Sequence, residues 1–98
     1  MSVLDPHAVD RALSGGIAWQ RAGDELVKER RGRDFADALA FVNAVGALAE
    51  EANHHPDIDI RWNTVTLRLQ THSAGGITEA DLALARSIDE LDPGPPAS

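Results

Sequence analysis

Cysteine is absent from the 98-residue sequence, which excludes a disulfide framework and a thiolate metal site. The sequence lacks an apolar run long enough to cross a bilayer, and Met1–Asp10 lacks the basic start and apolar stretch of a signal peptide. Basic residues are also few, because 9 lysines and arginines oppose 16 acidic residues for a net charge of −7. Phosphate backbones attract basic residues, so this deficit argues against nucleic acid as a partner. We therefore expect a cytoplasmic protein that contacts neither membrane nor nucleic acid.

The length and composition fit one small globular domain. A chain of this size buries roughly 60–70% of the surface that its unfolded form exposes, which allows a self-sufficient core. Apolar residues make up 43% and charged residues 26% of the sequence, close to the average for soluble domains. We expect one domain over residues 1–91 and a disordered tail over residues 92–98, where prolines and a glycine follow Asp92.

Capping residues and apolar spacing predict three helices. Asp5 offers a side-chain acceptor before Pro6, whose missing N–H costs nothing at the first helical position. Asp34 precedes the segment with the strongest helical periodicity, and Thr78-x-x-Asp81 resembles a capping box. The expected helices run from Asp5 to about Leu13, from Asp34 to about Ala52, before His54-His55-Pro56, and from Thr78 to Leu91.

Alternating apolar residues predict two pairs of strands. One pair, Ile17–Arg21 and Glu25–Arg31, flanks a turn at Ala22-Gly23-Asp24. In the second pair, alternation through Ile58–Trp62 changes parity in Val65–Leu69, which predicts a bulge or bend near Asn63-Thr64 and makes Trp62 a core residue. Connections this short imply antiparallel pairing. The predicted fold is an α+β two-layer sandwich, in the order α-β-β-α-β-β-α, with three helices on one face of a four-stranded antiparallel sheet.

Three of the four histidines fall between positions 54 and 72, and histidine exchanges protons near neutral pH. Glu50 lies four residues before His54, where a helical carboxylate would hold that imidazole in one tautomer. Pro56 forces His55 into extended backbone, and His72 is expected at the end of the last strand. The pattern favours acid–base chemistry. From the residues alone, capping of the helix end by the paired histidines and a plain surface position for His72 stay open as alternatives.

Other kinds of site have less support in the sequence. Adjacent histidines rarely meet one metal ion, and the spacing differs from the helical His-x-x-x-His arrangement. Gly75-Gly76 is too short for a phosphate loop, and the basic run from Lys28 to Arg33 is interpreted as a solvated strand end. A serine nucleophile is unsupported, because no serine lies in an elbow-like context: Ser14, Ser73 and Ser87.

Taken together, these residues resemble the signature of the pterin-4a-carbinolamine dehydratase family. The signature combines an acid, His-His-Pro, an aromatic, a further histidine and an aspartate, and here it consists of Glu50, His54-His55-Pro56, Trp62, His72 and Asp81. The similarity extends from about Ala18 to Leu91. The sequence departs from the family at Arg30 and Gly32, where aromatics are common, and at Ile58, where many members have tryptophan.

The resemblance implies a lyase, a 4a-hydroxytetrahydrobiopterin dehydratase, which acts without a metal or a cofactor. Its product would be quinonoid dihydropterin, as in tetrahydrobiopterin recycling. It implies that His54, His55 and His72 are catalytic, and that the remaining signature residues orient imidazoles or contact substrate: Glu50, Asp81 and Trp62.

The resemblance also implies partners. They are the pterin substrate, a second copy of the chain in a dimer or a tetramer, and an aromatic amino acid hydroxylase as a candidate. The alternative function is a non-catalytic binding module, either a dimerisation cofactor or an assembly chaperone. Such a module would display a large exposed apolar patch.

Overall fold

The computed structural model describes residues 2–91, so the predicted tail over residues 92–98 lies outside the described residues. The predicted order of elements and the α+β architecture are confirmed. The helices and strands are α1 (Pro6–Ser14), β1 (Gln20–Ala22), β2 (Glu25–Arg31), α2 (Phe35–Ala52), β3 (Asp57–Arg61), β4 (Thr64–Leu69) and α3 (Glu79–Leu91).

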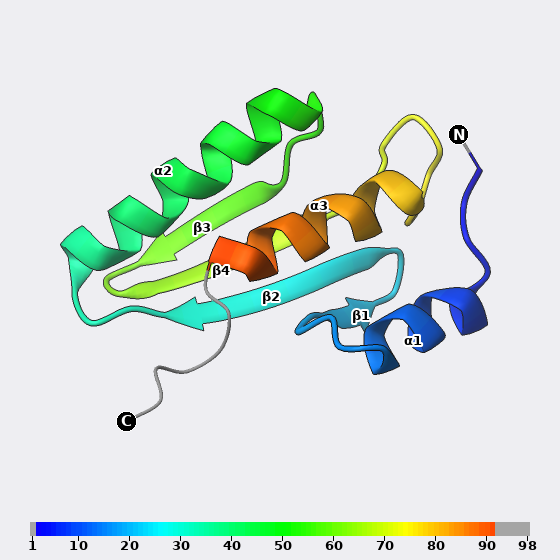
Figure 1. The fold of residues 1–98 in the computed structure, drawn as a ribbon, viewed down its shortest axis with the longest axis horizontal. Helices are drawn as coiled ribbons and strands as arrows, with labels where there is room; N and C mark the ends of the chain where they lie inside the picture. The colour runs from blue at the N-terminus through cyan, green and yellow to red at the C-terminus, as the bar shows by residue number, and fades with distance from the viewer. Residues whose placement is uncertain (1, 92–98) are drawn as a thin grey trace.

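The four strands form one antiparallel sheet in the order β1-β2-β4-β3, so two hairpins meet through β2 and β4. Helices α2 and α3 pack side by side against this sheet, and α1 lies beside β1 (Figure 1). Within the range described, no helix is long and apolar enough to span a membrane.

The core lies between the sheet and the helices. Leu26 of β2 pairs with Leu69 of β4, and both side chains are fully buried. Helix α2 turns its buried stripe toward them, as the periodicity predicts. The core cluster contains Val9, Ile17, Trp19, Leu26, Ala38, Phe41, Val45, Val65, Leu67, Leu69, Ile77, Leu82, Leu84, Ala85 and Ile88.

The change of parity between β3 and β4 comes from a two-residue turn, not from a bulge. Ile60 pairs directly with Val65, and cross-strand partners point to the same face, so even positions of β3 face the core with odd positions of β4. Trp62 lies in the turn with a positive φ of 55° and is 67% exposed. The interpretation of Trp62 as a core residue is therefore wrong, because the chain reverses before its side chain reaches the sheet face.

The first strand is shorter than predicted. Ile17 and Trp19 are buried, but the chain at this point is bonded to α3 rather than to β2. The Ala18 N–H donates to Asp89 Oδ2 at 2.9 Å, and the Trp19 indole N–H donates to Asp89 Oδ1 at 2.8 Å. Pairing with β2 consequently begins only at Gln20, and the predicted turn narrows to Gly23-Asp24.

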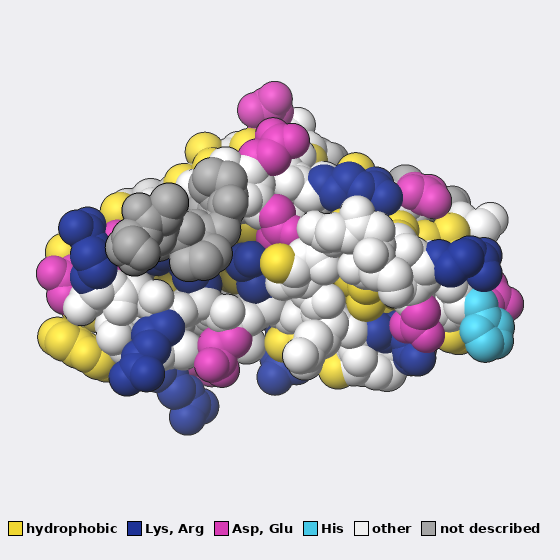
Figure 2. All heavy atoms as spheres, turned by 60° about the horizontal axis from the view of Figure 1, so that its bottom comes forward, with side chains coloured by type: hydrophobic (Ala, Val, Ile, Leu, Met, Phe, Trp, Pro, Cys, Tyr) yellow, Lys and Arg dark blue, Asp and Glu magenta, His cyan; other side chains and the backbone are white. Residues whose placement is uncertain are grey.

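Arg30 of β2 and Gly32, the residue after that strand, stand where the sequence departs from the pattern of aromatics described above, and both belong to a packed cluster at the start of α2. The Arg30 guanidinium lies 4.6 Å from the centre of the Phe41 ring and 3.5 Å from Asp37 Oδ2. A Cβ on Gly32 would come within 2.8 Å of Asp37 Oδ2, so only glycine fits there without movement. The Gly32 N–H also donates to Asn63 O at 2.7 Å, which ties β2 to the β3–β4 turn. Figure 2 shows Lys and Arg side chains at this end, at the left, and also toward the opposite end of the same face.

Candidate active site

The C-terminus of α2 presents two consecutive histidines on different sides. Asn53 takes the left-handed conformation with φ 50°, and the His54 N–H still donates to Ala49 O at 3.1 Å. Because the helix ends at Ala52, the spacing of one helical turn between Glu50 and His54 no longer holds. Glu50 Oε2 instead lies 2.5 Å from Nε2 of His55. The predicted pairing of Glu50 with His54 is therefore wrong.

The partner of His54 is the carboxylate of Asp81. Nε2 of His54 lies 2.5 Å from Asp81 Oδ1, and the Asp81 side chain is fully buried. Asp81 Oδ2 accepts hydrogen bonds from the Thr71 hydroxyl at 2.9 Å and from the Thr78 N–H at 2.8 Å. Asp81 occupies the third position of α3, so the predicted capping box is confirmed. The same carboxylate thus caps a helix and holds an imidazole.

The two histidine–carboxylate pairs differ in exposure. The side chains of His54 and Asp81 are 17% and 0% exposed, whereas those of His55 and Glu50 are 54% and 79% exposed. Water screens the exposed pair of His55 and Glu50 and competes for its hydrogen bonds, so Glu50 holds His55 weakly. The pair of His54 and Asp81 is shielded from solvent, and Asp81 therefore fixes the orientation of His54.

His72 lies in an exposed loop and not at the end of a strand. Strand β4 stops at Leu69, and a bridge between Thr71 and Gly76 closes the loop that carries His72. The His72 side chain makes no hydrogen bond to another residue within the described range, but Thr71, its neighbour, is bonded to Asp81. Asp81 is therefore bonded directly to the imidazole of His54 and, through Thr71, to the loop that carries His72.

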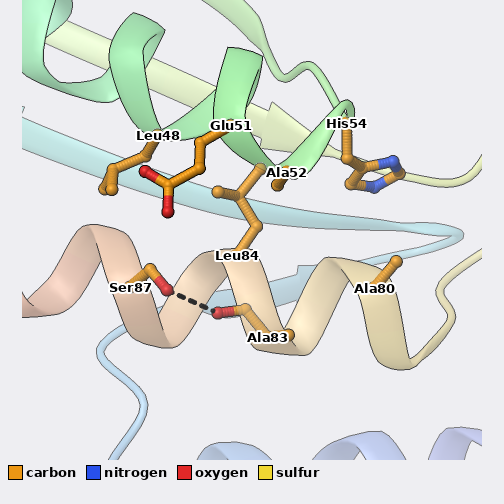
Figure 3. A pocket seen from close by; sticks show the side chains of 8 residues that line it. All are labelled: Leu48, Glu51, Ala52, His54, Ala80, Ala83, Leu84 and Ser87. Carbon is orange, nitrogen blue, oxygen red and sulfur yellow. Dashed lines mark hydrogen bonds between the residues drawn. The ribbon is translucent and has the colours of Figure 1, made fainter.

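A hollow of about 320 Å³ lies between the end of α2 and the facing side of α3, from Ala80 to Ser87. His54 lies at one end of it, and the Glu51 side chain projects from α2 toward α3 (Figure 3). Its volume is at the lower end of the range for small-molecule sites. Neither His55 nor His72 is among the lining residues, which are Leu48, Glu51, Ala52, His54, Ala80, Ala83, Leu84 and Ser87.

Trp62 is not brought together with the histidines. His54 and His55 precede β3 and Trp62 follows it, so the length of this strand, about 16 Å for five residues, separates them.

Conversely, sequence reasoning missed Thr71 as part of the site, because its contact with Asp81 joins residues 10 positions apart that lie on different elements. Among residues 2–91, no three histidine, aspartate or glutamate side chains form a set of metal ligands.

Fold and site together define a class: a small α+β protein with an imidazole held by a buried carboxylate beside a hollow. A sequence model of the family described as "Pterin 4 alpha carbinolamine dehydratase" matches residues 2–91. A protein of Thermomicrobium roseum named "Putative pterin-4-alpha-carbinolamine dehydratase" is 53% identical over 91 residues, which cover 93% of this chain and 98% of that protein. The chain belongs to the pterin-4a-carbinolamine dehydratase family.

Two solved structures are similar to this fold. One is a transcriptional coactivator/pterin dehydratase from Brucella melitensis, with a TM-score of 0.86 and 28% identity over 92% of this chain and 98% of that chain. The other is a pterin dehydratase-like protein identified as a RuBisCO assembly factor in the alpha-carboxysome. Its TM-score is 0.64, with 31% identity over 76% of this chain and 88% of that chain. The names of these structures thus include roles besides dehydration.

Proposed function

We propose that this protein dehydrates 4a-hydroxytetrahydrobiopterin to quinonoid dihydropterin and water, with His54, His55 and His72 as its catalytic residues. The observation that carries the proposal is the contact of His54 with a fully buried carboxylate in a member of this family. A buried aspartate that fixes one ring nitrogen leaves the other nitrogen free to exchange a proton with substrate. The open space beside His54 leaves that ring accessible.

The reaction needs two proton transfers and no redox step. The C4a–O bond breaks as the departing hydroxyl takes a proton from one group. A second group accepts the proton of the adjacent ring nitrogen, and a C=N double bond forms. We assign these two roles to His54 and His72, and contact with the substrate or the leaving hydroxyl to His55. Positioned acids and bases contribute typically 10²–10⁴-fold each, so these residues suffice without a metal or a cofactor.

The test is to add purified protein to freshly generated 4a-hydroxytetrahydropterin and to follow dehydration in the ultraviolet, with the uncatalysed rate subtracted. His54→Ala and His72→Ala should each lower kcat by roughly 10²-fold, with a smaller effect on substrate binding. The double variant should lose less than the product of the single losses, because groups that act as a unit are not additive. His7→Ala is the matched control, since His7 is exposed on α1 and its side chain makes no hydrogen bond to another residue within the described range.

The second candidate function is a binding module, and the two structural neighbours named for coactivation and assembly support it. On this chain, Phe35 and Leu39 lie one turn apart on α2 and are 45% and 39% exposed. If both histidine variants fold and keep the wild-type rate, catalysis is rejected and the binding module replaces it.

We also propose that the protein is a cytoplasmic homodimer, with a tetramer as the alternative and an aromatic amino acid hydroxylase as a candidate partner. Strands β1 and β3 are the edges of the sheet, and pairing of edges between two copies would cover their free backbone groups. Ile58, which is 39% exposed on β3, favours that edge. Light scattering should give twice or four times the mass of the chain, and a monomer at all concentrations would contradict the proposal.

A further inference from the structure

Thr71 occupies a junction between the two histidines of the proposed reaction. Its side chain is directed to Asp81, which holds His54. Its backbone closes the loop of His72: the Thr71 N–H donates to Gly76 O at 2.8 Å, and Thr71 O accepts from the N–H groups of Ala74 and Gly75 at 3.0 and 2.9 Å. Thr71 itself is only 8% exposed, so water does not replace these contacts.

The direction of the hydrogen bonds around Thr71 follows from counting hydrogens. A hydroxyl carries one hydrogen, and that of Thr71 goes to Asp81 Oδ2. The 2.8 Å contact between the two threonine hydroxyls is therefore donated by Thr78. Asp81 Oδ2 accepts from Thr71 and from the Thr78 N–H, and because a carboxylate has no hydrogen to donate, Oδ1 must accept from Nε2 of His54. The imidazole consequently carries its hydrogen on Nε2, and Nδ1 has the free lone pair.

We propose that Thr71 is a positioning residue that couples His54 to His72, and that Nδ1 of His54 is the atom that exchanges the proton with substrate. The hydroxyl of Thr71 fixes Asp81 and, through it, the tautomer of His54. The backbone of Thr71 sets where the loop begins that carries His72. Thr71 thus helps to set the position of both imidazoles. This inference rests on the proposed dehydratase function.

The variant that tests the side chain is Thr71→Val, which keeps the shape and the backbone but removes the hydroxyl. It leaves the buried Asp81 Oδ2 with one donor fewer, and kcat should fall roughly 10-fold or more by the usual worth of a hydrogen bond to a charged group. KM should change little. Thr71→Ser restores the hydroxyl and should restore kcat. Thr66→Val is the matched control, because Thr66 lies on β4 and makes no side-chain hydrogen bond within the described range.

The second readout is the ¹⁵N spectrum of the His54 imidazole at alkaline pH, where free histidine side chains are neutral. The wild type and Thr71→Ser should show hydrogen on Nε2, and Thr71→Val should show a mixture of both tautomers. Hydrogen on Nδ1 in the wild type would overturn the inference whether or not any variant folds. A folded Thr71→Val with wild-type kcat, or a Thr71→Ser as slow as Thr71→Val, would overturn it as well.

Failure of the inference can be told from failure of the proposed function. If the wild type does not dehydrate the pterin, the function is rejected, whereas the spectrum still reports which nitrogen of His54 carries hydrogen. If the wild type is active and His54→Ala is slow while Thr71→Val is not, the function stands and only the role of Thr71 is rejected.

Discussion

Asp37 and Asp81 occupy the same position, the third residue of a helix, in two different parts of the molecule. Each accepts a backbone N–H that precedes its helix: Asp37 from Arg33 at 2.9 Å, and Asp81 from Thr78 at 2.8 Å. Their other partners differ. Asp37 meets the guanidinium groups of Arg30 and Arg33, whereas Asp81 meets an imidazole and a hydroxyl.

The partners decide what each carboxylate can do. A guanidinium stays charged at every pH that the fold survives, so the cluster around Asp37 moves no proton and serves to hold the start of α2 against β2. An imidazole takes and releases protons near neutral pH, so the same capping position becomes part of a reactive site. A capping carboxylate is therefore recognised as functional only by what else it touches.

The largest difference between the two aspartates should be in catalysis. Asp81→Asn keeps the size of the side chain but offers an NH₂ group that competes with the His54 N–H, which favours the wrong tautomer. We expect kcat to fall by roughly 10²-fold or more, as in other imidazoles that lose their carboxylate. Asp37→Asn should leave kcat within about 2-fold, because no catalytic residue touches it. Dehydration rates that fall equally in the two variants would contradict this difference between Asp81 and Asp37.

A smaller difference separates Asp81 from an exposed carboxylate in the free energy of unfolding. Asp81→Ala leaves the donors of His54, Thr71 and Thr78 unsatisfied in a buried site, which should cost about 2–4 kcal/mol. Glu50→Ala removes a pair open to water and should cost below about 1 kcal/mol. Urea unfolding of both variants measures these values. A loss for Asp81→Ala as small as that for Glu50→Ala would mean that water already reaches the site.

The smallest effect concerns the pH dependence of stability at Asp37. The Arg33 N–H, followed by the charges of Arg30 and Arg33, holds the pKa of Asp37 below its ordinary value of 3.8. A lowered pKa adds stability that is present above pH 3.8 and is lost as the pH falls through the lower folded-state value. Asp37→Asn should therefore have a lower urea midpoint than the wild type near neutral pH, and the gap should close in acid. A gap that is constant across this range would contradict the assignment.

Local signals in the sequence predicted much of the fold. Asp34 and Thr78-x-x-Asp81 cap helices through contacts within four residues, and these predictions hold. The errors arose where the outcome depended on distant partners. Ala18 and Trp19 bind Asp89 of α3 and do not extend strand β1, and Asp81, not Glu50, binds His54. Spacing along a helix cannot reveal the latter, because the left-handed Asn53 rotates the chain just before the histidines.

The two tryptophans differ in solvent exposure, so their fluorescence should respond differently to quenching and to unfolding. Trp19 is 4% exposed and its indole N–H is bonded to Asp89, while Trp62 is 67% exposed in the β3–β4 turn. Acrylamide should quench the fluorescence of Trp62 and spare that of Trp19, and only the emission of Trp19 should shift strongly to the red on unfolding. A Trp62→Phe variant would therefore report the integrity of the core through a single fluorophore, without any label.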